Sequence, residues 1–577
     1  MRSSLLSILL VSATAGCVLL PGIGAAPLWD DDEPKNAACS LAMLDSGDWV
    51  VPTFNGELRV EKPPLVNWVQ LAGVSLLGRS EAGVRVGSVM LTVGSCLLCW
   101  WLGRLLAGPL VGLLTGLIMA SCIWTAIGGR AATPDAPLVF CTTLAAAIFA
   151  HAIRPGGPGT LGRLHAAGIG LACGLAVLAK GPVGIVLPVA AFVGMLWWLQ
   201  TTVTGNWLAS LPTAIRRFRP LLVGGIALAV ALPWYILVSI RTGGRWLEEF
   251  LLVHNVGRFA APMEGHDGTP FYYPAVLAMG LFPWSLVILA VPLHAWFTWR
   301  SNQVTDRRRL PLAFAGCWIM VWVGTFSLAG TKLPGYVWPA YPALALLTAI
   351  YLADWLEGRT GWERQLWRQL SPAAVMNLGW ASLGLVGCGF ALGLPLVARR
   401  YAPGQEWLGL IGLVPIMAAG LGATCQRLRH PRLALATLTA SAAVLLALLG
   451  GVAAVRLARH QGSAALIAAV PASSRPGTWA GLHPLSPSLV FYTGQAIRSL
   501  PDAEACLDLL WTDPSARLVI HAERLAEILP QLPPDCRLLS LKPASFDPAL
   551  AVIGRAGDPA AEQVALQAST PFPILME

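Results

Sequence analysis

Residues 220–240 read Pro-Leu-Leu-Val-Gly-Gly-Ile-Ala-Leu-Ala-Val-Ala-Leu-Pro-Trp-Tyr-Ile-Leu-Val-Ser-Ile, without one charged side chain. A helix needs about 20 apolar residues to cross the hydrocarbon core of a bilayer. This stretch therefore predicts a membrane-spanning helix. Comparable charge-free runs recur along the first 455 residues, at Leu105–Gly129, Leu310–Thr331, Leu370–Ala398 and Leu433–Val455.

Eight shorter or adjoining apolar runs raise the predicted number of spans to about thirteen. They are Leu5–Leu20, Val86–Gly103, Ala136–Ala150, Leu164–Ala179, Val183–Leu199, Pro274–Leu293, Leu333–Tyr351 and Trp407–Thr424. We expect helices in all of them, because the alternating pattern of a membrane barrel is absent. Leu5–Leu20 also fits the apolar part of a cleaved signal peptide. A retained helix is favoured, because it would hold the acidic loop that follows it against the membrane.

The composition excludes several classes of protein. Of 577 residues, 55% are hydrophobic and 12% are charged, and the mean hydropathy is +0.64. Soluble domains carry about 25% charged residues, and disordered chains are far less apolar. The sequence has no Walker loop, no GxGxxG between a strand and a helix, and no paired CxxC zinc motif. We therefore expect membrane lipids as surroundings, and no nucleotide and no nucleic acid as partner.

The distribution of charge predicts how the chain crosses the membrane. If the spans alternate from a cytoplasmic N-terminus, the cytoplasmic segments carry 17 arginines and four acidic residues. The opposite loops up to Val455 carry 13 basic and 15 acidic residues. An excess of positive charge marks the cytoplasmic side. We predict a multi-pass protein of the cytoplasmic (inner) membrane, with a transmembrane domain at 1–456, external loops at 28–84 and 241–273, and an exported domain at 457–577.

The exported segment predicts a small α/β domain. Strand-like runs alternate there with helical patterns; the strands are expected at Leu489–Tyr492, Leu518–His521, Leu538–Leu541 and Leu550–Ile553, and the helices at Ala503–Leu510 and Ala522–Leu529. Cys506 and Cys536 both fall in this domain. An oxidising compartment permits a disulfide between them, and spacing alone does not decide whether it forms.

The first external loop concentrates charge near the membrane. It carries Trp29-Asp-Asp-Asp-Glu-Pro-Lys35 and places Glu61-Lys62 directly before a rigid Pro63-Pro64 pair. Leu41–Leu44 and Leu65–Leu71 have the apolar spacing of helices that lie in the membrane interface. Such helices would hold the carboxylates at the bilayer surface. The simpler alternative is a solvated acidic loop.

Further isolated charges lie at the predicted outer ends of spans. Asp135, Lys180 and Lys332 occupy such ends, and His254 and Arg258 are four residues apart in the second external loop. Each alone is typical of a snorkelling or capping residue. Because all of them fall on one side of the membrane, we predict that they converge on a single cavity.

A series of motifs occurs in one order along the chain. These are Asp32-Glu-Pro-Lys35, Met43-Leu-Asp-Ser-Gly-Asp-Trp-Val-Val-Pro52, Glu61-Lys-Pro-Pro64, Thr133-Pro-Asp-Ala-Pro137, Ala179-Lys-Gly-Pro182, Pro233-Trp-Tyr235, His254-Asn-Val-Gly-Arg-Phe259 and Thr331-Lys-Leu-Pro-Gly-Tyr336. Together they resemble the ArnT-like lipid-linked glycosyltransferases, which include the aminoarabinose transferases of lipid A and are related to the protein O-mannosyltransferases. The resemblance implies a mainly α, GT-C-type fold with about thirteen transmembrane helices and a C-terminal exported domain.

The resemblance also implies a reaction. A sugar would pass, with inversion, from a polyprenyl-phosphate donor of the undecaprenyl-phosphate type to a lipid A-like lipid, a glycan or another envelope acceptor on the external face. The alternatives are a transporter or flippase of a lipid-linked substrate, and a protein O-mannosyltransferase-like enzyme. A transporter predicts charges near mid-span and internal repeats, whereas the charges here lie at outer ends.

Positions in the motifs imply roles for individual residues. The implied catalytic acids are Asp32 and Asp135, the donor-phosphate ligands are Lys62, Arg258 and Tyr336, further substrate contacts are Glu33, Lys35 and Lys332, and positions near a metal are Glu61 and His254. Cations suit the charge that develops on a phosphate leaving group. With a hydroxyl acceptor Asp32 would be the general base; with a phosphate acceptor both acids would mainly orient substrates. A divalent metal (zinc, magnesium or manganese) is the one cofactor implied, although two ligands make an incomplete site.

The chain departs from the lipid A enzymes at two places. Those enzymes have Arg-Tyr after Asp-Glu-Ala, where this chain has Lys35-Asn36. An aromatic residue stands one position before their Phe-Glu-Lys-Pro, where this chain has Arg59. Both places lie where sugar and acceptor are expected to meet.

Overall fold

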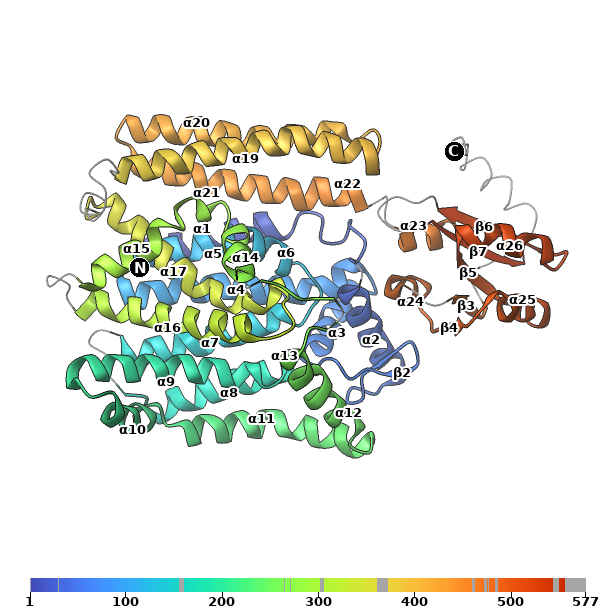
Figure 1. Ribbon diagram of the computed structural model, residues 1–577, viewed down its shortest axis with the longest axis horizontal. Coiled ribbons are helices and arrows are strands. Elements are labelled where there is room, and N and C mark those ends of the chain that lie inside the picture. The colour runs from blue at the N-terminus through green and yellow to red at the C-terminus, as the bar shows by residue number, and fades with distance from the viewer. Residues whose placement is uncertain are drawn as a thin grey trace.

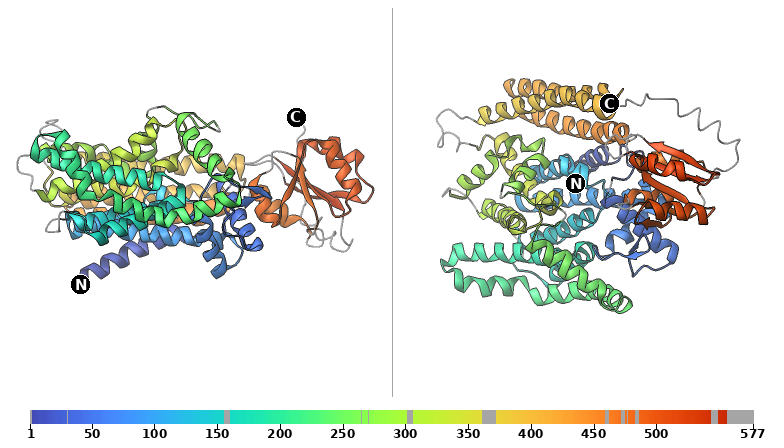
Figure 2. Two further views of the ribbon diagram at one scale, coloured as in Figure 1. Left: turned by 90° about the horizontal axis from the view of Figure 1, so that it is seen from below. Right: turned by 45° about the vertical axis from the view of Figure 1, so that its right-hand side comes forward.

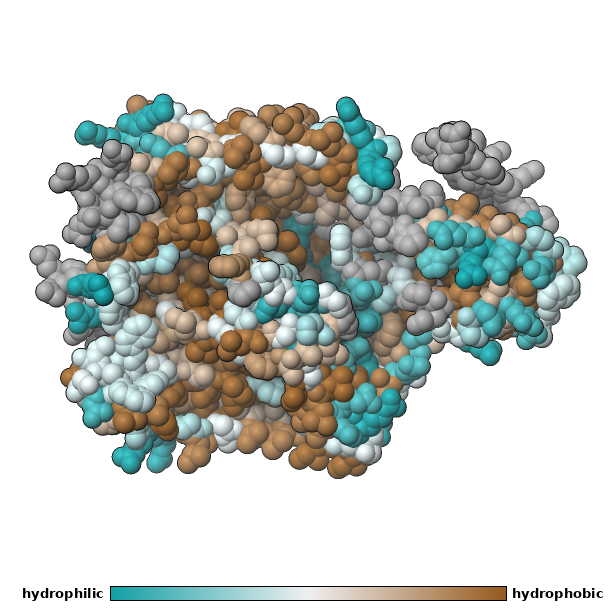
Figure 3. All heavy atoms as spheres, in the orientation of Figure 1, coloured by the Kyte–Doolittle hydropathy of each residue, from teal (hydrophilic) through white to brown (hydrophobic). Residues whose placement is uncertain are grey.

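The protein consists of a helical bundle with a smaller α/β domain at one end (Figure 1). The computed structural model describes residues 2–29, 31–154, 160–263, 265–269, 271–300, 306–360, 372–458, 462–471, 475, 477–482, 486–542 and 549–555. Apolar side chains cover the visible face of the bundle, and polar ones gather on the α/β domain (Figure 3). This arrangement confirms a mainly α membrane protein.

Ten helical segments among the described residues are long and apolar enough to cross a membrane. They are α4 (Glu81–Ala107), α7 (Asp135–Ile153), α8 (Arg163–Lys180), α9 (Val183–Thr204), α11 (Pro220–Arg241), α16 (Asp306–Leu328), η3 with α17 (Pro334–Ala340, Tyr341–Leu356), α19 (Pro372–Tyr401), η4 with α20 (Glu406–Gly412, Leu413–Arg427), and α21 with η5 and α22 (Pro431–Leu448, Leu449–Ala453, Ala454–Ala458). A further helix, α10 (Trp207–Phe218), packs on α9.

The other three predicted spans are shorter or interrupted. α1 (Arg2–Leu19) packs against α4, α21 and the short α5 (Pro109–Ala120). After α5 the chain breaks before α6 (Ile123–Gly128), because the Ile123 N–H donates to the Phe282 carbonyl (3.0 Å). The third of these spans, 274–293, is divided into α14 (Tyr272–Gly280), η2 (Trp284–Val287) and α15 (Ala290–Arg300). The helix is interrupted because Pro283 has no N–H to continue it.

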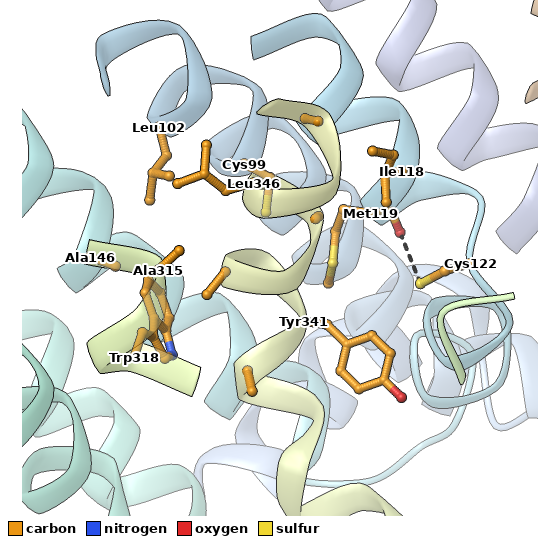
Figure 4. Packing of buried hydrophobic residues seen from close by; sticks show 14 of the residues in the cluster. Cys99, Leu102, Ile118, Met119, Cys122, Ala146, Ala315, Trp318, Tyr341 and Leu346 are labelled. Carbon is orange, nitrogen blue, oxygen red and sulfur yellow. Dashed lines mark hydrogen bonds between the residues drawn. The ribbon is translucent and has the colours of Figure 1, made fainter. Parts of the chain in front are cut away.

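The core of the bundle lies where α4, α5, α7, α16 and α17 meet (Figure 4). Large side chains such as Trp318 and Tyr341 are buried there against small ones such as Ala146. Small residues let membrane helices approach closely. This packing fixes the ends of α7 and η3, which carry two of the predicted site residues.

The two external loops fold into short elements at the end of the bundle that bears the α/β domain (Figure 1). The first loop contains α2 (Asp32–Ser46), β1 (Thr53–Phe54), β2 (Glu57–Leu58) and α3 (Leu65–Leu77), and the second contains α12 (Arg245–Glu248), the π-helical η1 (Glu249–Gly257) and α13 (Arg258–Ala260). The helices predicted around Leu41–Leu44 and Leu65–Leu71 are therefore confirmed.

The C-terminal domain is built on a five-stranded mixed sheet with strand order β4-β3-β5-β7-β6. Its elements are α23 (Gly462–Ala469), β3 (Trp479–Leu482), α24 (Pro487–Thr493), β4 (Ile497–Leu500), α25 (Ala503–Thr512), β5 (Arg517–His521), η7 (Ala522–Arg524), α26 (Leu525–Ile528), η8 (Leu529–Gln531), β6 (Cys536–Lys542) and β7 (Leu550–Arg555). The strand predicted at Leu489–Tyr492 is wrong, because this run forms α24, and a short apolar run does not separate helix from strand. Cys506 and Cys536 are free thiols.

The C-terminal domain docks on the first external loop (Figure 2). Asn55 and Gly56, both with positive φ, form the two-residue turn of the β1–β2 hairpin. The amide of Asn55 donates to the Ile497 carbonyl (2.9 Å) and accepts from the Ile497 N–H (2.7 Å). Strand β4 lies at the edge of the sheet, so its backbone groups are available for this pairing.

Tyr492 makes a second link between the two parts. Its hydroxyl accepts from the Leu28 N–H (2.8 Å) and donates to Glu81 Oε1 (3.2 Å). Burial raises the pKa of Tyr492, which keeps the hydroxyl protonated as a donor.

We expect Tyr492→Phe to weaken this docking by about 1–3 kcal/mol, because a buried N–H loses its acceptor. Limited proteolysis between α22 and β3, together with thermal unfolding in detergent, measures the effect. Tyr272→Phe on α14 serves as control. Equal protection from protease in both variants would show that Tyr492 does not hold the domain in place.

Candidate active site

A cavity of about 110 Å³ lies among the external elements of the bundle. Its charged and polar lining consists of Glu61, Lys62, Lys180, His254, Asn255, Arg258 and Tyr336, and its apolar lining of Leu138, Val183, Phe250, Phe259, Trp322, Phe326 and Ala329. These residues come from segments between 61 and 336 in the sequence. The predicted convergence of distant charged residues on one cavity therefore holds for Lys180, His254 and Arg258, whereas Asp135 and Lys332 are not part of the lining.

Lys62 stands between β2 and α3, where Pro63 and Pro64 fix the backbone. Burial, reinforced by the neighbouring ammonium of Lys180, lowers the pKa of Lys62 from 10.5 to about 8. Asp32 and Asp135 oppose this shift electrostatically. Both predicted acids therefore lie close enough to act on the Lys62 ammonium.

Asp135 and Lys180 form an ion pair at the cavity. Asp135 is the first residue of α7, and Lys180 is the last residue of α8. The Lys180 ammonium donates to Asp135 Oδ1 and lies 5.1 Å from the centre of the Tyr336 ring. The ion pair between the ends of α7 and α8 thus lies beside the Tyr336 ring, and Asp135 reaches the cavity through Lys180, which lines it.

Two glycines permit this close packing. Gly181 has φ +80°, and a β-carbon there would lie 2.6 Å from the Phe250 ring, so only glycine ends α8 in this way. A β-carbon at Gly335 would lie 3.3 Å from Asp135 Oδ2. Glycine at these two motif positions therefore lets Phe250 pack on the end of α8 and lets η3 approach Asp135.

The second external loop supplies His254 and Arg258 to the same cavity. Because residues 249–257 form a π-helix, side chains four positions apart still lie near one another along one side. The Asn255 amide donates to the Phe250 carbonyl (2.6 Å) and thereby supports this turn. His254 and Arg258 are therefore placed as predicted.

Glu33 has a structural position. Its side chain is 5% exposed and is paired with Arg85 (2.6 Å). The same carboxylate accepts from the backbone N–H groups of Trp29 and Ala132 (2.8 Å each). Glu33 thus ties the start of α2 to α4 and to the segment before Asp135, and the structure does not place it on the cavity.

Besides Asp135, which is paired with Lys180, three other predicted residues also lie outside the cavity lining. The Lys332 ammonium donates to the carbonyls of Ser327 and Ala329 (2.9 Å each) at the end of α16. Asp32 is exposed on the first turn of α2, and Lys35 is half-buried one turn later. Asp32 still acts on Lys62, whereas the ammonium of Lys332 is explained by its carbonyl partners.

Glu61 and His254 line the cavity together, as the metal prediction requires. Glu61 Oε2, however, is bonded to Arg59 Nε (2.9 Å). Within the described part of the chain, no three His, Cys, Asp or Glu side chains are grouped so that they could hold a metal ion. Among the described residues the cavity thus offers only these two ligands, an incomplete site for a divalent metal.

Two residues of this region were absent from the predicted site. Lys180 was noted only as an isolated charge, and its pairing with Asp135 depends on how α7 and α8 pack. Arg59 was noted only as a departure from the family pattern, and it is buried (5% exposed) beside Glu61. The signal in the sequence was for Lys180 an isolated charge at the predicted outer end of a span, and for Arg59 its place two residues before Glu61.

An apolar groove of about 720 Å³ lies next to the charged cavity. Its lining includes Pro182 and Leu251, the sequence neighbours of Val183 and Phe250 in the cavity wall. Most of the groove follows α11, whose Leu232 and Ile236 are exposed on the side of the bundle. A charged cavity beside an apolar groove fits a molecule with an anionic head and a hydrocarbon chain.

Comparison with known proteins agrees with this geometry. Residues 29–248 match the family model of dolichyl-phosphate-mannose-protein mannosyltransferase. An undecaprenyl phosphate-alpha-4-amino-4-deoxy-L-arabinose arabinosyl transferase of Pseudomonas paraeruginosa is 30% identical over 431 residues, 73% of this chain and 71% of that protein. The corresponding protein of Pseudomonas aeruginosa is 31% identical over the same shares. The crystal structure of ArnT from Cupriavidus metallidurans bound to undecaprenyl phosphate has the same fold, with a TM-score of 0.74, 20% identity, and coverage of 95% of this chain and 97% of that one. The chain belongs to the ArnT-like family of lipid-linked glycosyltransferases.

Proposed function

We propose that this protein transfers a sugar from a polyprenyl-phosphate donor to a lipid A-like or other envelope acceptor, with inversion at the sugar. The observation that carries the proposal is the convergence of Lys62, Arg258 and Tyr336 on one cavity beside an apolar groove. Two relatives named for an undecaprenyl phosphate-linked sugar support the class of donor.

The proposed reaction is a displacement at the anomeric carbon. An acceptor oxygen attacks this carbon from the face opposite the phosphate, and the bond between the carbon and the phosphate oxygen breaks. The electron pair of that bond stays on the polyprenyl phosphate, which leaves as an anion. Lys62, Arg258 and the hydroxyl of Tyr336 stabilise the charge that develops on the leaving phosphate, and they are most effective in a partly dry cavity.

The two acids stand outside the cavity lining but close enough to act on Lys62, and we assign them to the acceptor. A hydroxyl acceptor loses its proton to a carboxylate as the new bond forms, and Asp32 is the proposed base because it is exposed. Asp135 orients Lys180 through their ion pair. A phosphate acceptor is already ionised, and both acids then orient substrates.

The proposed location is the external face of the cytoplasmic membrane, with a cytoplasmic N-terminus. The start of α1 lies at the end of the bundle away from the C-terminal domain (Figure 2). The charge distribution along the sequence supports the same orientation.

The test is transfer by the full chain in vesicles that contain an undecaprenyl-phosphate sugar and lipid A. Mass spectrometry of the extracted lipids is expected to show lipid A heavier by one sugar residue. Transfer to a co-reconstituted protein acceptor would favour an O-mannosyltransferase-like enzyme. Movement of the donor between leaflets without a new glycosidic bond would favour a flippase and contradict the proposal.

A further inference from the structure

The two places at which this chain departs from the lipid A enzymes are in contact with each other. Arg59 Nη2 donates to Asn36 Oδ1 (2.9 Å), and its Nη1 donates to the Lys35 carbonyl (3.2 Å). The remaining edge of the guanidinium, Nε, donates to Glu61 Oε2 (2.9 Å). Arg59, Asn36 and Glu61 therefore form one hydrogen-bonded network, which we call the Arg59 network.

The Arg59 network stands directly behind the cavity wall. Arg59 is 5% exposed and Asn36 is fully buried, whereas the side chain of Glu61 is 32% exposed and faces the cavity. Glu61 is the one carboxylate among the described residues that line the cavity. The network thus decides how much negative charge the lining offers to a substrate.

The charge of Glu61 is strongly compensated. Its Oε2 accepts from the Arg59 guanidinium (2.9 Å), and Lys35 and Lys62 also act on this carboxylate electrostatically. Three cations therefore surround it. Lys62, Lys180 and Arg258 add positive charge to the lining. Asp135 is paired with Lys180, and Asp32 acts on Lys62.

This balance favours one kind of sugar. The donor brings a single negative charge at its phosphodiester, and the cations of the lining match it. An ammonium on the sugar would approach a surface on which Glu61 and Asp135 each already have a cationic partner. Placing like charges together in a partly dry site lowers affinity by about tenfold or more.

We propose that Arg59 is a specificity-determining residue, and that the sugar this protein transfers from its polyprenyl-phosphate donor carries no amino group. This inference rests on the proposed function. The transfer step is unchanged: the bond between the anomeric carbon and the phosphate breaks, its electrons stay on the phosphate, and the acceptor oxygen forms the new bond. The amino group that distinguishes the two classes of sugar takes no part in that step. It affects only how tightly the donor binds.

The test compares matched donors on the full chain in vesicles with lipid A. Each pair consists of an undecaprenyl-phosphate pentose or hexose and its amino-deoxy analogue, for example arabinose with 4-amino-4-deoxy-arabinose. Binding is followed by the shift in unfolding temperature with donor concentration, and transfer by mass spectrometry. In every pair that binds, we expect the uncharged member to bind about tenfold or more tightly.

Variants connect this preference to the Arg59 network. Arg59→Gln removes the cation behind Glu61. We expect the affinity for the uncharged donor, divided by that for its amino-deoxy analogue, to fall by about tenfold. Arg79→Gln, the same change at an exposed arginine paired with Asp45 in this loop, is expected to leave the ratio unchanged. Glu61→Gln removes the carboxylate and is expected to raise this affinity ratio. If Arg59→Gln does not fold, Glu61→Gln alone tests whether the Arg59 network sets the preference.

The outcomes separate this inference from the proposed function. Equal or tighter binding of amino sugars by the wild-type protein would overturn the inference, and so would an unchanged ratio in both Arg59→Gln and Glu61→Gln. Binding of uncharged donors without transfer to any acceptor would overturn the proposed function, while the binding ratio would still support the role of Arg59.

Discussion

Lys62→Ala is expected to lower kcat/KM for the polyprenyl-phosphate donor by about 100-fold or more. Removing one preorganised donor that faces a developing oxyanion typically costs this much. Lys62 lines the cavity together with Arg258 and Tyr336, so its loss leaves the leaving phosphate with fewer donors. The measurement is initial transfer rate against donor concentration in vesicles. Arg79→Ala, in the same loop but on an exposed ion pair, is the control.

The pH profile sharpens the test of Lys62. Because the pKa of Lys62 is lowered to about 8, the ammonium is present below this pH and is lost above it. We therefore expect kcat/KM for the donor to fall with rising pH through about 8, since this quantity reports the free enzyme. Lys62→Arg keeps its charge and is expected to remove the alkaline fall. An alkaline fall that persists in Lys62→Arg would assign it to another group.

Much of the membrane part could be predicted from the sequence because hydrocarbon allows few backbone solutions. Helices that begin at Asp135 and end at Lys180 follow from the apolar runs beside these charges. The division of 274–293 was missed, because hydropathy counts Pro283 as part of an apolar run and ignores its absent N–H.

The candidate site was predicted in outline but not in its pairings. That Lys62, Arg258 and Tyr336 share a cavity was predicted from motifs that fall on one side of the membrane. Which charges neutralise one another was not predictable, because partners come from different elements. Glu33 is paired with Arg85 on α4, and the Lys332 ammonium donates to backbone carbonyls at the end of α16.

The soluble domain shows a different limit. Strands β5, β6 and β7 were predicted because each has a run of apolar or alternating residues. The apolar run in α24 is as short as that of a strand. In so short a segment the spacing of apolar residues does not distinguish a helix from a strand. Its helical state agrees with Pro487 in its first turn, a position that proline favours, and the finished helix packs on α2.

Asp32→Asn is expected to lower the rate of transfer to a hydroxyl acceptor by about 100- to 10,000-fold, the range for loss of a general base. Asp32 is exposed and forms no part of the cavity lining, so the change is expected to leave the affinity for the donor within about twofold of wild type. Saturated transfer rate and donor affinity, measured separately, test both statements.

Asp135→Asn provides the matched comparison for Asp32→Asn. Asp135 accepts from Lys180, whose ammonium lies over the Tyr336 ring. Without this carboxylate the Lys180 ammonium is no longer held in place beside the Tyr336 ring, so we expect weaker donor binding together with a lower rate. An acceptor phosphate needs no base, and with such an acceptor Asp32→Asn is expected to retain most of its activity while Asp135→Asn does not. If Asp32→Asn instead loses donor affinity as Asp135→Asn does, Asp32 positions the donor, and the base is another residue.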